Sequence, residues 1–100
     1  MRILMNKFGE RLMSRPAGRE AYLAARAYVL PSSATELTFD FNGIKVLAPS
    51  WLSEFIGLVR EQYGQKVSIR FVNTDNPSVR VTIETLTKLE PITIGQSAST

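Results

Sequence analysis

The chain has 100 residues, of which 44% are hydrophobic and 21% are charged, a composition typical of one globular domain with its own core. It contains no cysteine and no histidine, which excludes disulfides, thiolate zinc sites, Cys nucleophiles and Ser-His-Asp triads. The formal net charge is +3, too small to predict a nucleic-acid-binding protein.

The N-terminal segment predicts two short strands followed by a helix. Residues 2–8 are mostly apolar and favour a first strand, and residues 11–13 are interpreted as a second strand that pairs back on it. Ser14 is a good N-cap, so a helix is predicted to begin there and to end before residues 31–33. The face of this helix is expected to consist of Ala17, Ala21, Ala24 and Tyr28.

The centre of the chain has the clearest periodicity. Residues 35–41 alternate strictly, with Leu37, Phe39 and Phe41 on one side, which predicts a strand. Residues 44–47 are short and apolar and lead directly into the start of a second helix. The buried stripe of that helix is predicted to contain Leu52, Phe55, Ile56, Val59 and Tyr63, with Gly64 following as its C′ residue.

The C-terminal part contains one strand and one ambiguous segment. Residues 66–72 alternate again and predict a strand. Residues 79–86 fit both a strand and a helix, because the β-branched residues favour a strand while Asn76-Pro77 is a helix-start signal. Residues 91–94 are interpreted as a last edge strand.

The order of elements predicts an α/β fold. Strands alternating with helices indicate a small, mostly parallel or mixed sheet of about four to five strands with two to three helices. We expect a single domain over residues 1–95 and a polar tail over residues 96–100. No signal peptide or membrane span is found in the sequence, so we expect a cytoplasmic protein that does not bind membranes.

Three short motifs resemble a known family. They are Ser14-Arg-Pro-Ala-Gly-Arg19, Asp40-Phe-Asn-Gly-Ile44 and Ser50-Trp-Leu-Ser-Glu-Phe55. In order and spacing they resemble a STAS-like bacterial family of uncharacterised function, which is distantly similar to the STAS domains of anti-sigma-factor antagonists. The resemblance extends over roughly residues 3 to 89 and implies a helix at residues 79–89. It also implies a non-catalytic regulatory module whose partner is a signalling or ATPase-type protein.

The chain differs from the antagonists at the residue that accepts phosphate. In the antagonists a serine that accepts phosphate follows an aspartate at the start of the second helix. The corresponding positions here are Pro49 and Ala48, so the usual phosphate acceptor is missing. Ser50, at the next position, is either an N-cap of the helix or a substitute phosphate acceptor, and its place in the sequence favours the cap.

The other candidate residues also have two interpretations each. Trp51 is either an exposed residue of a partner surface or a ring packed over a neighbouring helix. Arg15 and Arg19, with Ser14 and Gly18, could cradle an anion at the helix start. The alternative, which we prefer, is that Arg19 pairs with a carboxylate such as Asp40 or Glu54.

Asp40 and Glu54 are expected to be structural carboxylates. Asp40 is predicted to accept N–H groups from the Asn42-Gly43 turn, and Glu54 lies one turn into the second helix, where its charge suits the helix dipole. Neither has a His or Cys partner, and together with Asp75 they are too scattered in the sequence for a metal set.

Four function classes follow from these observations. The leading hypothesis is a protein-binding module without enzymatic activity, cofactor or metal, whose surface consists of Arg15, Gly18, Arg19, Pro49, Ser50, Trp51 and Glu54. The main alternative is a small-molecule or nucleotide-binding module that uses Arg15, Arg19 and the Pro49-Ser50 helix start. A nucleic-acid accessory protein is a weaker possibility, and a hydrolase is the least supported.

Overall fold

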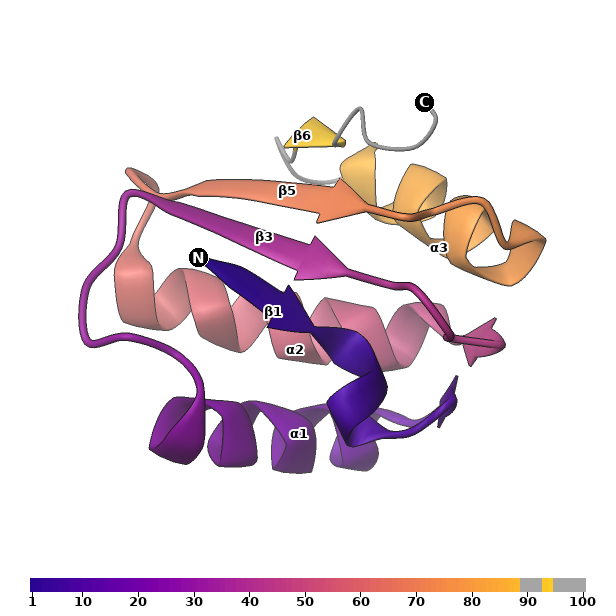
Figure 1. Cartoon of the computed structure of the whole chain (residues 1–100), viewed down its shortest axis with the longest axis horizontal. Coiled ribbons are helices and arrows are strands. Elements are labelled where there is room, and N and C mark those ends of the chain that lie inside the picture. The colour runs from indigo at the N-terminus through magenta and orange to yellow at the C-terminus, as the bar shows by residue number, and fades with distance from the viewer. Residues whose placement is uncertain (89–92, 95–100) are drawn as a thin grey trace.

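The computed structural model describes residues 1–88 and 93–94 of the chain. Within these residues the fold consists of two parallel sheets and three α-helices, with one short 3₁₀ helix after the first strand (Figure 1). In chain order the elements are β1 (Arg2–Leu4), η1 (Met5–Phe8), β2 (Arg11–Leu12), α1 (Arg15–Tyr28), β3 (Glu36–Asp40), β4 (Val46–Leu47), α2 (Pro49–Tyr63), β5 (Ser68–Val72), α3 (Pro77–Thr87) and β6 (Thr93–Ile94). The predicted α/β class is confirmed.

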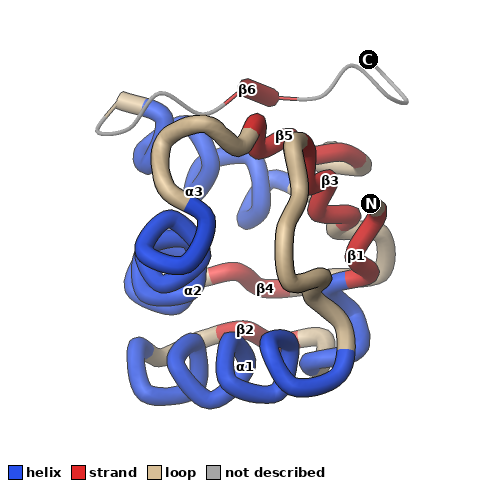
Figure 2. The backbone as a smooth tube through the Cα atoms, turned by 90° about the vertical axis from the view of Figure 1, so that its left-hand side faces the viewer, coloured by secondary structure: helices blue, strands red, loops and turns tan. Residues whose placement is uncertain are grey.

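The larger sheet has the strand order β1-β3-β5-β6, and every neighbouring pair is parallel. Phe39 of β3 lies level with Ile3 of β1 and Phe71 of β5, and these three side chains point to the same face. All three helices lie on that side of the sheet (Figure 2), and the three side chains are fully buried beneath them. The alternation seen in the sequence therefore marks the core face correctly.

The opposite face of this sheet is polar and partly exposed. The strand register places Arg2 of β1, Thr38 of β3 and Arg70 of β5 side by side in one row on this face. Arg70 pairs with Glu36 of β3 across a distance of 3.5 Å. Residues 93–94 pair with β5 at the sheet edge, so a last edge strand exists there, while the predicted polar tail lies outside the described residues.

The smaller sheet corrects one prediction. Residues 11–12 do not pair back on the first strand, because they form β2, which pairs in parallel with β4. The free edge of β4 is covered by α3: the Leu47 N–H donates to Ser78 Oγ (3.0 Å), and Thr82 Oγ1 donates to the Leu47 carbonyl (2.6 Å). Two hydroxyls of α3 thus satisfy the backbone groups that an edge strand leaves unpaired.

The ambiguous segment near the C-terminus is helical. Asn76 caps α3 by accepting hydrogen bonds from the backbone N–H groups of Ser78 and Val79, at 2.8 and 3.3 Å. Pro77 occupies the first helical position, where its fixed φ suits a helix. The capping signal therefore outweighs the strand preference of the β-branched residues, as the family resemblance implied.

The buried face of α1 differs from the predicted one. Gly18, Ala21, Tyr22 and Ala25 are buried, whereas Tyr28 is 88% exposed and Ala17 and Ala24 face solvent. Of the predicted face only Ala21 is buried, because alanines occur on both faces of this helix and do not define a stripe. By contrast, the predicted stripe of α2 is buried throughout, except that Tyr63 is half-buried.

Candidate functional site

The candidate residues meet where the first half of α1 crosses the start of α2. Gly18 is the point of closest approach: a Cβ added to it would lie 2.5 Å from the Trp51 carbonyl oxygen. No side chain larger than hydrogen fits in that space, so this glycine allows the two helix backbones to touch. This close contact fixes the position of α1 relative to α2. It therefore also fixes the backbone positions from which the neighbouring side chains extend.

Trp51 belongs to the core and not to the surface. Its side chain is only 1% exposed and stacks on Phe55, with ring centroids 5.1 Å apart and an interplanar angle of 9°. Phe8 of η1 lies against the same ring, at a centroid distance of 6.3 Å. The interpretation of Trp51 as an exposed partner residue is therefore wrong, and the packed ring is what the structure shows.

Two arginines of α1 converge on one carboxylate of α2. Arg15 Nη1 lies 3.2 Å from Glu54 Oε1, and Arg19 Nη1 lies 3.9 Å from Glu54 Oε2. Both arginine side chains are more than half exposed, while Glu54 is 22% exposed. Arg19 is thus paired with Glu54, as the structural interpretation expected, but Arg15 makes the shorter contact. The cluster carries one excess positive charge at the surface.

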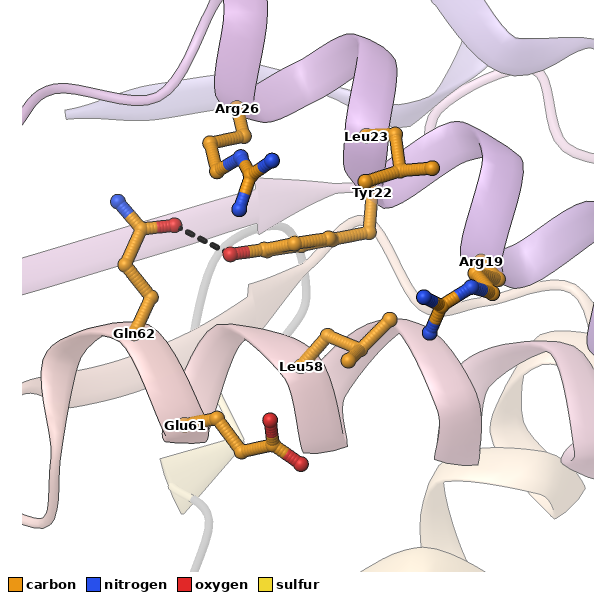
Figure 3. Close-up of a pocket in the computed structure, with 7 residues that line it drawn as sticks. All are labelled: Arg19, Tyr22, Leu23, Arg26, Leu58, Glu61 and Gln62. Carbon is orange, nitrogen blue, oxygen red and sulfur yellow. Dashed lines mark hydrogen bonds between the residues drawn. The ribbon is translucent and has the colours of Figure 1, made fainter.

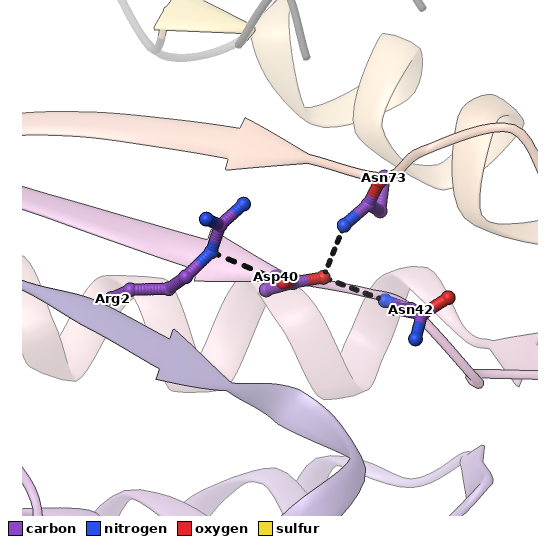
Figure 4. A network of polar contacts seen from close by, with 4 residues as sticks. All are labelled: Arg2, Asp40, Asn42 and Asn73. Atoms are coloured by element: carbon purple, nitrogen blue, oxygen red, sulfur yellow. Dashed lines mark hydrogen bonds and ion pairs between the residues drawn. The ribbon is translucent and has the colours of Figure 1, made fainter. Parts of the chain in front are cut away.

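Asp40 has a separate, structural role at the end of β3 (Figure 4). Its Oδ1 accepts hydrogen bonds from the Asn42 backbone N–H (2.9 Å) and from Asn73 Nδ2 (2.8 Å), and its Oδ2 lies 3.1 Å from Arg2 Nε. The residue is 7% exposed, so these partners satisfy a buried charge. The predicted bond to the Asn42-Gly43 turn is present, and Arg2, instead of Arg19, is the cation that pairs with Asp40.

A groove follows the same helix pair toward the C-terminal half of α1. Its volume is about 420 Å³, and its lining residues are Arg19, Tyr22, Leu23, Arg26, Leu58, Glu61 and Gln62 (Figure 3). Of these residues, only Arg19 was a candidate from the sequence. The available signal was the spacing of Arg19, Tyr22 and Arg26 at i, i+3 and i+7, which places them on one side of a helix.

The comparisons with known proteins give the family. A family model described as a STAS-like domain of unknown function (DUF4325) matches residues 26–79, just over half of the chain. The chain belongs to this family of STAS-like domains. The match extends from the last turn of α1 to the first turn of α3, so it includes Ser50 and Glu54 but not Arg15 or Arg19. Searches of curated proteins and of solved structures gave no match.

In this STAS-like domain the start of α2 differs from the capped helix that we predicted. Pro49 is the first helical residue and Ala48 occupies the N-cap position, with no side-chain cap. Ser50 is therefore inside the first turn, and its capping role was predicted wrongly. The Ser50 hydroxyl is partly exposed and has no hydrogen-bond partner among the described residues. It lies one turn before Glu54, on the same side of α2.

The described part of this STAS-like domain contains no group of three or more His, Cys, Asp or Glu residues that could hold a metal ion. Nor is any helix among the described residues long and apolar enough to span a bilayer.

Tyr63, at the end of α2, has a raised pKa: burial raises it, and the nearby Tyr22 raises it further. Tyr63 lies four turns from the Pro49 end of α2, away from the arginine–carboxylate cluster.

Proposed function

We propose that this STAS-like domain is a non-catalytic regulatory module that binds another protein through the surface formed by Arg15, Arg19, Pro49, Ser50 and Glu54. Similarity to the anti-sigma-factor antagonists suggests that the partner is a signalling or ATPase-type regulator. The chain has no His or Cys for acid–base or nucleophilic chemistry, which favours binding over catalysis.

The observation that carries the proposal is the sharing of Glu54 between Arg15 and Arg19. One carboxylate cannot neutralise two guanidinium groups, so each arginine keeps N–H donors that point to solvent. Exposed charges of one sign on a rigid surface steer an oppositely charged partner and increase the association rate. The tight crossing at Gly18 fixes the helices that carry these groups, which lowers the entropy cost of docking.

The test is partner capture from a lysate of the source organism, with a charge-reversed variant. Arg15→Glu/Arg19→Glu should lose the captured protein that the wild-type domain retains. The matched control, Lys66→Glu/Arg80→Glu, makes the same change in net charge at two exposed residues outside the surface and should retain it. Equal melting temperatures of the two variants would show that the loss is not caused by unfolding. Retention of the partner by the Arg15/Arg19 variant would contradict the proposal.

The alternative function, an anion-binding module at Arg15, Arg19 and the Pro49-Ser50 helix start, makes a different prediction. Glu54 already occupies the space between the two guanidinium groups, so a bound anion would have to displace it. We therefore expect phosphate and nucleotides to leave the melting temperature unchanged. A dose-dependent rise of several degrees that Arg19→Ala abolishes would favour the anion-binding module over the protein-binding one.

A further inference from the structure

The groove between α1 and α2 contains cations that the fold leaves without a carboxylate of their own. Arg26 makes no ion pair within the described residues, and its guanidinium lies over the ring of Tyr22, 5.7 Å from the centroid. Arg19 reaches only the far oxygen of Glu54, which Arg15 already holds. In Figure 3 the guanidinium groups of Arg19 and Arg26 both extend from α1 toward α2.

The apolar floor between these two cations consists of Leu23 and Leu58, and Glu61 of α2 adds one carboxylate to the lining of the groove. Leu23 and Leu58 are half-buried there and pack against the core. The Tyr22 hydroxyl donates a 2.7 Å hydrogen bond to Gln62 Oε1, which ties α1 to α2 across the groove. Tyr22 is 5% exposed, and its ring forms a T-shaped pair with Phe55 at a centroid distance of 6.4 Å. The shape of the groove is therefore set by the core beneath it.

The spacing of the cations defines what fits. Arg19 and Arg26 are seven residues apart on α1, which is two turns or about 10 Å along the helix axis. A complementary ligand has two carboxylates at that separation and an apolar group between them for Leu23 and Leu58. An α-helix with acidic residues at i and i+7 and leucines at i+3 and i+4 presents all of these on one face.

We propose that this groove binds an acidic amphipathic helix of a partner protein, which packs beside α1 and α2 as a third helix. The inference rests on the proposed protein-binding function and specifies the chemistry of the partner. A helix is favoured over a small dicarboxylate because both arginines are at the surface, where a single charge pair contributes little to affinity. A helix adds leucine burial on the apolar floor, which a small dianion does not supply.

The experiment is a titration of the ¹⁵N-labelled full chain with a synthetic helical peptide that has Glu at i and i+7 and Leu at i+3 and i+4. Amide shifts should concentrate on residues 19–26 and 58–62. Arg26→Glu should weaken binding by about tenfold, because it removes a charge pair and also places a carboxylate against the carboxylate of the peptide. Lys66→Glu, with the same change in net charge at an exposed residue outside the groove, should change it by less than about twofold. Arg26→Gln should weaken binding less than Arg26→Glu does.

Several outcomes would overturn the inference. One is that a scrambled peptide of the same composition binds as tightly as the designed peptide. Another is that Lys66→Glu weakens binding as much as Arg26→Glu does. Either result would mean non-specific attraction. Another is absence of shifts in the groove at millimolar peptide. Saturable shifts there with suberate, but not with the peptide, would assign the groove to a small ligand. If the peptide fails while capture of the natural partner still depends on Arg15 and Arg19, this inference is wrong and the proposed function stands.

Discussion

At the scale of single residues, the two serines near the helix starts have different roles despite similar surroundings. Ser14 precedes the first residue of α1 and accepts a hydrogen bond from the Ala17 N–H at 3.2 Å. Ser50 follows Pro49, which occupies the first helical position of α2. The preference of proline for that first position is the signal that would have placed the cap at Ala48.

This difference predicts opposite results for two identical substitutions. Ser14→Ala removes a capping acceptor and should lower the free energy of unfolding by about 1 kcal/mol. Ser50→Ala removes a hydroxyl without a partner and should change it by less than about 0.5 kcal/mol. Urea denaturation followed by circular dichroism measures both. A loss of 1 kcal/mol or more for Ser50→Ala would show that its hydroxyl does cap α2.

Tyr63 predicts how stability depends on pH in the alkaline range. Its pKa is raised by burial and by Tyr22, and its hydroxyl donates a hydrogen bond to the Pro31 carbonyl. A raised folded-state pKa means that the folded protein holds this proton more tightly than the unfolded chain does. The stabilisation is present below the unfolded-state pKa of about 10 and is lost as pH rises through the higher folded-state value.

The measurement is the free energy of unfolding at pH 8 and at pH values through and above 10, for the wild type and for Tyr63→Phe. The variant should be less stable at pH 8, because the Pro31 carbonyl loses its donor. The difference between the two proteins should shrink as pH rises past 10. Parallel curves for the two proteins over that range would contradict the assigned titration.

At the scale of elements, local patterns were sufficient wherever large side chains mark a face. The strands β3 and β5 and the stripe of α2 were predicted from alternation and helical spacing, because Leu, Ile, Val and Phe occupy one side of each. The face of α1 was predicted correctly only at Ala21, because alanines occur on both sides of this helix. The pairing of β2 with β4 was missed because it depends on hydrogen bonds from distant segments, such as Lys45 N–H to the Glu10 carbonyl.

The α1–α2 crossing predicts opposite effects for two glycine substitutions. Gly18→Ala places a Cβ 2.5 Å from the Trp51 carbonyl oxygen, so the helices must separate, at a cost of about 1–3 kcal/mol. Gly57 lies within α2 with nothing within 4 Å of an added Cβ, so Gly57→Ala should stabilise the domain by about 0.4–1 kcal/mol. Thermal unfolding of the two variants compares them directly. A stabilising Gly18→Ala would mean that α1 and α2 do not meet as described.

At the scale of the whole molecule, the candidate site shows where sequence reasoning ends. The residue types were identifiable: Arg15, Arg19 and Glu54 were singled out on their motifs. Their partners were identifiable only in part: Glu54 was one of two carboxylates proposed for Arg19. The Arg15–Glu54 pair was not predicted, since it joins positions 39 residues apart and depends on how the two helices cross. The groove at Arg26 depends on the same crossing. Residue chemistry could thus be predicted, but its arrangement came only from packing between elements.

One ring joins the packing of η1, α1, α2 and the larger sheet. Phe55 is fully buried and contacts four aromatic side chains, each from a different element: Phe8 of η1, Tyr22 of α1, Phe39 of β3 and, stacked on it, Trp51 of α2. Phe55→Ala should therefore cost about 3–5 kcal/mol, a large part of the roughly 5–15 kcal/mol typical of a domain. Val81→Ala, a truncation on α3 at a side chain that is 60% exposed, is the control and should stay within about 0.5 kcal/mol. Chemical denaturation monitored by Trp51 fluorescence and by circular dichroism should give coincident transitions for both variants, with only that of Phe55→Ala shifted to lower denaturant. A transition of Phe55→Ala at the same denaturant concentration as that of the wild type would mean that the packing of these elements does not depend on this ring.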